Sequence, residues 1–119
     1  MPKQVKHLVI DDVDVIEDEY FVKLQPKEIK RIKWVIDRLK EKGLNVLLSS
    51  TDYAGSIQGY DNLYYLRIQY RTNIYRVFLC KYKKFYVLLY GIVKKTQRLQ
   101  QNDINKANQR KSLLLINEN

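Results

Sequence analysis

The chain has 119 residues and a mass of 14.3 kDa, which fits a single domain over residues 1–119. A hydrophobic share of 45% argues against a disordered chain, and a net charge of +9 favours a polyanionic partner such as nucleic acid. The single cysteine, Cys80, excludes an internal disulfide and a cysteine-rich zinc site, and no apolar run is long enough for a membrane span. We therefore expect a soluble, cytoplasmic protein without metal or cofactor.

The N-terminal part of the chain predicts a strand followed by a helix. Residues Val5–Ile10 are typical of a short strand, and Asp12 or Asp14 can cap a helix that runs to about Leu24. Six of the thirteen acidic residues fall between Asp11 and Glu19. They either form a solvated helix start, which the helix dipole favours, or keep the basic remainder away from wrong partners.

A second helix is predicted from Lys27 to Lys42. Its apolar residues recur at helical spacing, and Lys and Arg occupy the other side. Pro26 suits the opening of this helix, and Gly43 suits its end. The segment from Leu44 to Asn62 is rich in Ser, Thr, Gly and Asp, so it is predicted to be mostly loop.

Three consecutive strands are predicted next, joined by two tight turns. The strands cover Leu63–Arg71, Ile74–Tyr82 and Phe85–Val93, and the turns are Thr72-Asn73 and Lys83-Lys84. The third strand is almost wholly apolar, as expected of a strand that is buried on both faces.

A final helix is predicted after the polar segment that follows these strands. It spans about Asn102–Arg110, with Asn102 or Asp103 as its cap. The resulting order is β-α-α-β-β-β-α. It indicates an α+β protein in which a small antiparallel sheet packs against helices.

Hairpin geometry predicts which side chains share a face of this sheet. With two-residue turns, Arg67, Gln69 and Arg76 project from the same face. Gly91 then lies opposite Arg76 and leaves an open floor, and alternation carries the same face to Lys95. The sequence therefore predicts an exposed cationic patch of Arg67, Arg76 and Lys95.

A phosphodiester backbone suits such a patch, because Arg binds phosphate through two parallel hydrogen bonds and Lys adds a point charge. On RNA, the 2′-OH could attack the adjacent phosphate while the cations stabilise the charge that builds on its oxygens. The alternative is a basic edge that binds anions without selectivity. We expect Arg76 to be exposed, so Arg76→Ala should abolish activity and leave the fold intact.

The other residues that can carry chemistry have structural explanations. Ten tyrosines cluster mostly around the strands, and one or two could stack on bases or donate a proton. Tyr70 and Tyr90 fall on the face opposite the patch in the predicted register. His7, the only histidine, is expected to be structural or solvated. Trp34 is expected in the core, with a partner groove as the alternative.

Several segments together resemble the HigB-like, phage-derived branch of the RelE/ParE toxin superfamily, over about Lys27–Arg110. The segments that carry the resemblance are Leu63–Ile68, Tyr75–Phe78 and Val87–Thr96, followed by Ile104, Ala107 and Arg110. The sequence departs from the family's pattern at Tyr65, where Glu is usual, and at Tyr90, where His is usual.

The resemblance implies a RelE-like fold and the toxin of a type II toxin–antitoxin system. Members of this branch are ribosome-dependent, metal-independent endoribonucleases that cut mRNA and inhibit translation. A neighbouring helix-turn-helix antitoxin neutralises them, and a heterotetramer of toxin and antitoxin is an arrangement that fits. The resemblance and the face analysis give the catalytic candidates Arg76, Lys95 and Arg67, and the RNA-binding candidates Lys94, Arg71, Gln69 and Arg98.

Two other functions fit the same sequence. A toxin of the ParE type would poison DNA gyrase without acting as an enzyme, and it would share the fold. A module that has lost activity would act only in a repressor complex with its antitoxin, and the tyrosines at positions 65 and 90 make that alternative a real one.

Overall fold

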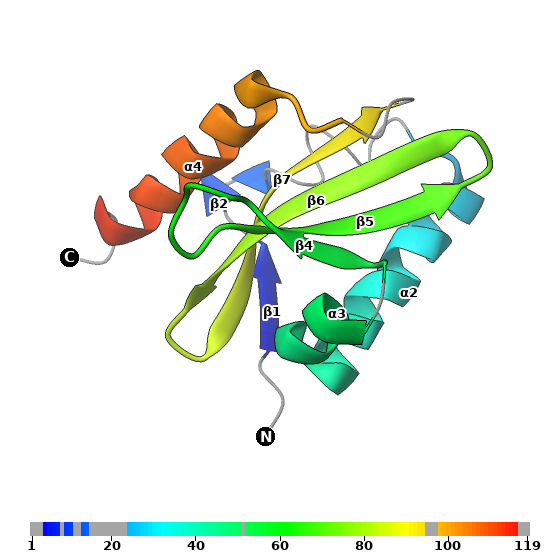
Figure 1. The fold of residues 1–119 in the computed structure, drawn as a ribbon, viewed down its shortest axis with the longest axis horizontal. Coiled ribbons are helices and arrows are strands. Elements are labelled where there is room, and N and C mark those ends of the chain that lie inside the picture. Colours follow the sequence, from blue (N-terminus) through cyan, green and yellow to red (C-terminus); the bar gives the residue numbers. More distant parts are fainter. Residues whose placement is uncertain are drawn as a thin grey trace.

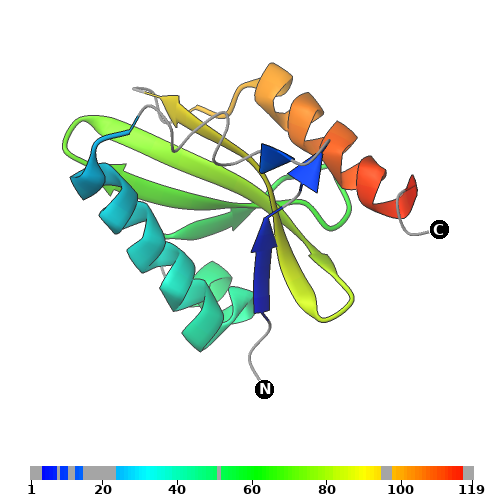
Figure 2. The ribbon, with the colours of Figure 1, turned by 180° about the vertical axis from the view of Figure 1, so that it is seen from behind.

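The computed structural model describes residues 4–7, 9–10, 13–14, 24–50, 52–94 and 98–116. A five-stranded sheet has the order β1-β7-β6-β5-β4, in which β4 to β7 are antiparallel and β1 runs parallel to β7 (Figure 1). Helices α2 and α3 lie on one side of the molecule and α4 on the other (Figures 1 and 2). The predicted α+β class is confirmed.

The elements are β1 (Gln4–His7), β2 (Val9–Ile10), β3 (Val13–Asp14), α2 (Pro26–Lys42), α3 (Leu44–Ser50), β4 (Ala54–Ser56), β5 (Tyr64–Tyr70), β6 (Asn73–Tyr82), β7 (Phe85–Lys94) and α4 (Gln101–Ile116).

The start of the chain differs from the prediction. The expected single strand is divided into β1, which pairs with β7, and β2, which pairs with β3 in a separate ribbon. Asp14, predicted to cap a helix, lies in β3. Most of the predicted helix that ends near Leu24, and most of the acidic segment 11–19, lie outside the described residues.

Helix α2 begins and ends where the sequence predicts. Pro26 is its first residue, and the Glu28 carboxylate accepts a hydrogen bond from the Gln25 N–H at 3.1 Å, as in a capping box. Gly43 ends the helix at φ 85°, a conformation that favours glycine, and its N–H donates to the Leu39 carbonyl at 3.0 Å. The apolar stripe of the helix is buried: Ile32, Val35, Ile36 and Leu39.

The segment predicted as loop contains helix α3 and strand β4. Leu44 and Leu47 are buried in the core, and the Leu44 N–H donates to the Tyr86 hydroxyl at 3.0 Å. The prediction is wrong here because these apolar side chains find tertiary partners that composition alone does not reveal. Strand β4 pairs with β5, where Gly55 lies opposite Tyr65.

The hairpin of β5 and β6 turns one residue earlier than predicted. Tyr70 pairs with Asn73, so the turn residues are Arg71 and Thr72, and Arg67 lies directly opposite Arg76. Because the pairing moves by two positions along β6, every side chain keeps its predicted face. The other predicted turn, Lys83-Lys84, is confirmed.

A β-bulge changes the faces along β7. Phe78 pairs with Tyr90 whereas Leu79 pairs with Leu88, so Leu89 is an extra residue in β7. The predicted pairing of Arg76 with Gly91 is therefore wrong, because Arg76 pairs with Ile92. An extra residue reverses which side chains of β7 share a face with Arg76.

The main core lies between α2 and the sheet. Leu66, Ile68 and Val77 are fully buried there, and α2 contacts β5. Helix α4 packs against β7 and β6 on the other face. No helix among the described residues is long and apolar enough to cross a membrane.

Candidate functional site

The face of the sheet toward α4 carries three cross-strand rows, each with one residue from β5, β6 and β7. Strand alternation and the bulge together set this arrangement. The row nearest the β5–β6 turn begins with the polar Gln69, the middle row holds two arginines, and the third row is aromatic. The rows are Gln69–Ile74–Lys94, Arg67–Arg76–Ile92 and Tyr65–Phe78–Tyr90.

Arg76 is buried, with only 2% of its surface exposed, so the expectation of an exposed cation is wrong. Burial lowers the pKa of its guanidinium, and the facing Arg67 lowers it further. Tyr65 and Asp103 act in the opposite direction and raise that pKa. Asp103 lies in the first turn of α4 and is itself 8% exposed. The helix therefore brings a carboxylate to the arginine that the sheet buries.

Arg67 differs from its neighbour because it reaches the surface. Its side chain is half-buried, and its guanidinium donates to the Gln69 amide oxygen at 3.4 Å. The Arg67 backbone N–H donates to the Tyr53 carbonyl at 2.7 Å, which ties this part of β5 to the start of β4. Gln69 is exposed. Arg67 and Gln69 are thus predicted site residues that a ligand can reach.

The aromatic row is covered by α4. The rings of Phe78 and Tyr90 stack at a centroid distance of 6.1 Å. The Arg110 guanidinium lies 5.0 Å from the Tyr90 ring centroid, and the Lys106 ammonium lies 4.8 Å from it. Arg110 also donates to the carbonyl of Leu89, the bulge residue, at 3.1 Å. Tyr90 therefore shares the face of Arg76, contrary to the prediction, because the bulge inverts its side.

The remaining predicted site residues do not join this face as a group. Lys95 lies outside the described residues, and Lys94 is placed only by its backbone, opposite Ile74. Arg98 is exposed in the segment before α4. Arg71 lies in the β5–β6 turn with its guanidinium 5.4 Å from the Tyr70 ring centroid.

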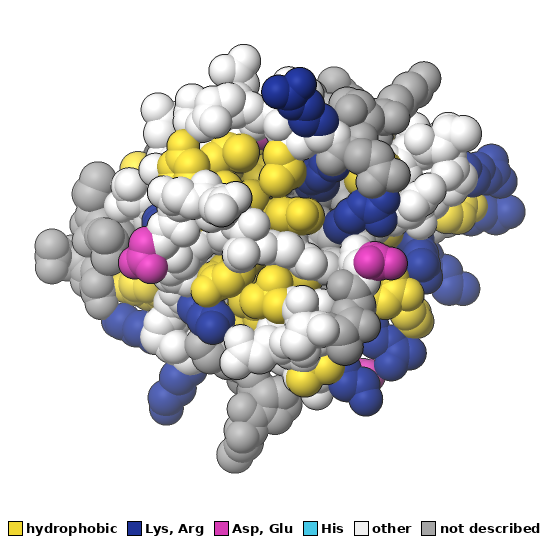
Figure 3. All heavy atoms as spheres, viewed as in Figure 1, with side chains coloured by type: hydrophobic (Ala, Val, Ile, Leu, Met, Phe, Trp, Pro, Cys, Tyr) yellow, Lys and Arg dark blue, Asp and Glu magenta, His cyan; other side chains and the backbone are white. Residues whose placement is uncertain are grey.

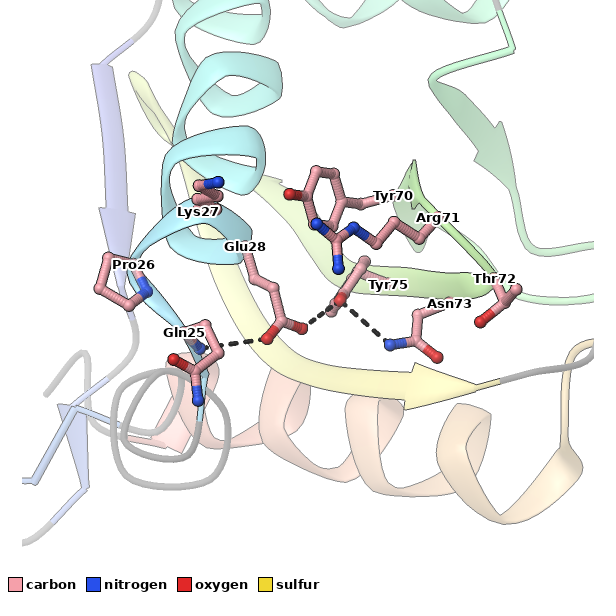
Figure 4. A pocket seen from close by; sticks show the side chains of 9 residues that line it. All are labelled: Gln25, Pro26, Lys27, Glu28, Tyr70, Arg71, Thr72, Asn73 and Tyr75. Atoms are coloured by element: carbon pink, nitrogen blue, oxygen red, sulfur yellow. Dashed lines mark hydrogen bonds between the residues drawn. The ribbon is translucent and has the colours of Figure 1, made fainter.

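Arg71 and Tyr70 instead line a hollow of about 460 Å³ at the start of α2 (Figure 4). Inside it the Tyr75 hydroxyl donates to the Glu28 carboxylate, and the Asn73 amide donates to the same hydroxyl at 3.4 Å. Burial raises the pKa of Tyr75, and the bond to Glu28 raises it further. Tyr75 points to the α2 face, so this hollow is on the side of the sheet away from Arg76. The prediction that Tyr70 lies opposite the patch is confirmed.

Sequence reasoning missed the role of Asp103. The sequence predicts Asn102 or Asp103 as the cap of the last helix, but the N–H groups of Asp103 and Ile104 both donate to the carbonyl of Gln100. Gln100 is therefore the cap, and Asp103, three residues later, is buried near Arg76. The sequence contained a signal for this position, because a carboxylate at the start of a helical apolar pattern can point toward the core as well as cap the helix. Helix α4 also extends beyond the predicted end, to Ile116.

Positive charge is unevenly spread over the face of the molecule that Figure 3 shows. In Figure 3 most Lys and Arg side chains lie on the half of the molecule that carries α2 and the β5–β6 turn. Among the residues that the structure describes, no group of three His, Cys, Asp or Glu could hold a metal ion.

Comparison with known proteins gives one family. The sequence model of the family described as phage derived protein Gp49-like (DUF891) matches residues 19–112, which include β4 to β7 and most of α4. No curated protein matches the chain.

Proposed function

This chain belongs to the Gp49-like family of phage-derived proteins, which are toxin-like modules that typically pair with an antitoxin, and we propose that it is the toxin of a type II toxin–antitoxin pair. We propose further that it inhibits translation by cutting mRNA on the ribosome. The resemblance of its strand and Lys-Lys-Thr segments to HigB-like toxins supports this reaction over other toxin activities.

The observation that carries the proposal is the facing pair of Arg67 and Arg76 on neighbouring strands. Like charges directly opposite one another destabilise a sheet, so two arginines placed at this position indicate a functional use. A polyanion placed over Arg67 would relieve the repulsion. The exposed amide of Gln69, which already contacts Arg67, would contribute a hydrogen bond to the same ligand.

The proposed chemistry is attack by the 2′-oxygen of a ribose on the adjacent phosphorus. The new bond from the 2′-oxygen to phosphorus forms as the bond to the 5′-oxygen breaks. The 2′-OH loses its proton, and the 5′-oxygen leaves with a proton as a hydroxyl. The products are a 2′,3′-cyclic phosphate and a 5′-OH end, and negative charge develops on the phosphoryl oxygens on the way.

Arg67 is the proposed catalytic residue, because its guanidinium lies at the surface, where it can contact those oxygens. One well-placed donor of this kind contributes a factor of roughly 10² to 10³ in rate. Arg76 is buried, so we propose that it acts through Arg67 as a positioning residue and adds positive potential from below. Lys94, Lys95 and Arg98 stay predictions as further phosphate contacts. No side chain is assigned as the base.

The proposal is tested by adding the purified protein to a cell-free translation system programmed with one defined mRNA. We expect translation to stop and new mRNA ends to appear, with a cyclic phosphate on the upstream fragment. An mRNA that carries a 2′-deoxyribose on the 5′ side of a mapped cut should resist cleavage there. A stop of translation with intact mRNA would contradict the reaction.

The same assay separates the competing toxin activity. A gyrase poison would leave the mRNA intact and would instead produce broken DNA in a supercoiling reaction. Protein that affects neither reaction, and cells that grow normally when it is produced without antitoxin, would identify an inactive module. Either result would contradict the proposed function.

A further inference from the structure

The side of α2 away from the core carries the chain's only tryptophan in an unusual setting. Trp34 is 37% exposed, so the expectation that it belongs to the core is wrong. The Arg31 guanidinium lies 4.7 Å from its ring centroid and the Arg38 guanidinium 4.6 Å from it. Tyr53 meets the ring edge-on at 5.7 Å between centroids. The indole is thus held in place between two cations while more than a third of it faces solvent.

A hollow of about 500 Å³ adjoins this cluster. Pro26, Ile29 and Trp34 give it an apolar lining, and Lys30 and Lys33 stand at its border together with Asp37. Helix α2 as a whole carries seven Lys and Arg against three carboxylates. One of those carboxylates, Glu28, is turned toward Tyr75 and away from this surface.

We infer that this α2 surface, formed by Arg31, Trp34, Arg38 and the adjoining hollow, binds an acidic, amphipathic segment of the partner protein. An apolar side chain of that segment would enter the hollow, and its carboxylates would meet the two arginines. The inference rests on the proposed pairing with an antitoxin but does not depend on RNA cleavage.

Two observations favour a peptide over RNA at this surface. A base stacks on an open ring face, but here guanidinium groups from the turns before and after Trp34 lie over the indole. Each guanidinium is held by the ring in a defined orientation, which leaves its planar fork available for a carboxylate. The neighbouring Glu41 is 3.6 Å from Arg38, but that pair is exposed and weak.

The position of the surface has a consequence for regulation. Helix α2 packs on the face of β5 that carries Leu66 and Ile68, whereas Arg67 points to the opposite face. A segment bound on α2 therefore leaves Arg67 uncovered. The partner would hold the toxin at a surface separate from the proposed RNA contact.

Full-length protein is titrated with a labelled synthetic helix that has Leu on one side and Glu on the other. We expect the peptide to raise the label's anisotropy and to shift the emission of Trp34. The double variant Arg31→Gln/Arg38→Gln should bind roughly tenfold more weakly, because two exposed charge contacts are lost. Lys30→Gln/Lys33→Gln provides a second variant at the border of the hollow and should also weaken binding.

The matched control is Lys83→Gln/Lys84→Gln, which removes the same charge at the β6–β7 turn and should change the affinity by less than about twofold. The inference is overturned if this control weakens binding as much as the α2 variants do, or if a peptide with Gln in place of Glu binds equally well. It is also overturned if polyuridine RNA displaces the peptide and shifts Trp34 emission. These outcomes leave the mRNA cleavage assay unaffected, so the two proposals fail separately.

Discussion

The two faces of the same sheet are built on different chemistry. The face toward α2 buries aliphatic side chains, and its deepest polar group, Tyr75, is neutral and bonded to Glu28. The face toward α4 buries a charge, Arg76, whose pKa is lowered by burial and raised in part by Tyr65 and by the Asp103 carboxylate in the first turn of the helix. A buried ion contributes little net stability, because removing its charge from water is costly. The buried arginine on the α4 face is therefore not explained by packing alone.

Within the α4 face, the facing arginines differ in what they can do. Arg76 is 2% exposed, whereas Arg67 is half-buried and reaches solvent. The same residue type at directly opposed positions therefore has a structural role in one strand and an accessible one in the next. Substitutions should separate these roles, because a change at Arg76 should act on stability and, through Arg67, on activity, whereas a change at Arg67 should act mainly on activity.

The largest effect is expected at the buried arginine. Arg76→Ala should lower the free energy of unfolding by about 3 kcal/mol, because it removes a large buried side chain and takes a cation away from the buried Asp103 carboxylate. Arg67→Ala should lower it by less than about 1 kcal/mol. Urea unfolding followed by circular dichroism measures both. Equal losses at the two positions would remove the distinction between them.

Alkaline pH should lower the free energy of unfolding in two stages, one set by each face of the sheet. Burial raises the pKa of the Cys80 thiol, on the α4 face, to about 11, and the pKa of Tyr75, on the α2 face, is also raised. Both groups bind their proton more tightly in the folded state, so their stabilisation is complete below their usual pKa values and is lost as the pH rises.

Between pH 9 and pH 11 the thiol should account for a loss of roughly 2 kcal/mol. Cys80→Ala should flatten the stability profile in that window, and Tyr75→Phe should flatten it only above pH 10. Urea midpoints measured across this range check the order. A Cys80→Ala variant with the same profile as the parent chain would contradict the assignment.

A smaller effect is expected at the bulge. Arg110→Met keeps the packing against Tyr90 but removes the donor to the Leu89 carbonyl, so it should cost about 1–2 kcal/mol. Lys106→Met is the matched change over the same ring and should cost less than about 0.5 kcal/mol. Thermal unfolding of the pair distinguishes them. Equal shifts would mean that the bulge does not depend on Arg110.

Local patterns predicted the elements that local forces determine. The helix from Pro26 to Gly43 has its apolar stripe, its opening proline and its terminal glycine in the sequence, and the structure confirms all three. The face shared by Arg67 and Arg76 was also predictable, because the misplaced turn moved the pairing by an even number of residues. The predicted face was therefore correct because the shift was even, although the predicted turn residues were wrong.

The features that the sequence did not predict depend on contacts between residues that are far apart in the chain. The extra residue Leu89 accepts a hydrogen bond from Arg110, which is 21 residues further along the chain. No pattern within β7 therefore predicts the bulge. The burial of Arg76 likewise depends on another element, because α4 packs on this face of β6 and β7. Helix α3 was missed because its leucines are recognisable as core residues only once Tyr86 and α2 are placed beside them.

The most direct test of the account is the rate of mRNA cleavage on the ribosome by two variants that lose one exposed or half-exposed cation each. In single-turnover assays at saturating protein, Arg67→Ala should cut at least about 10² times more slowly than the parent chain. Lys84→Ala, in the β6–β7 turn, should cut at the parent rate. A well-folded Arg67→Ala variant that cleaves at the parent rate would contradict the claim that this sheet face acts on RNA.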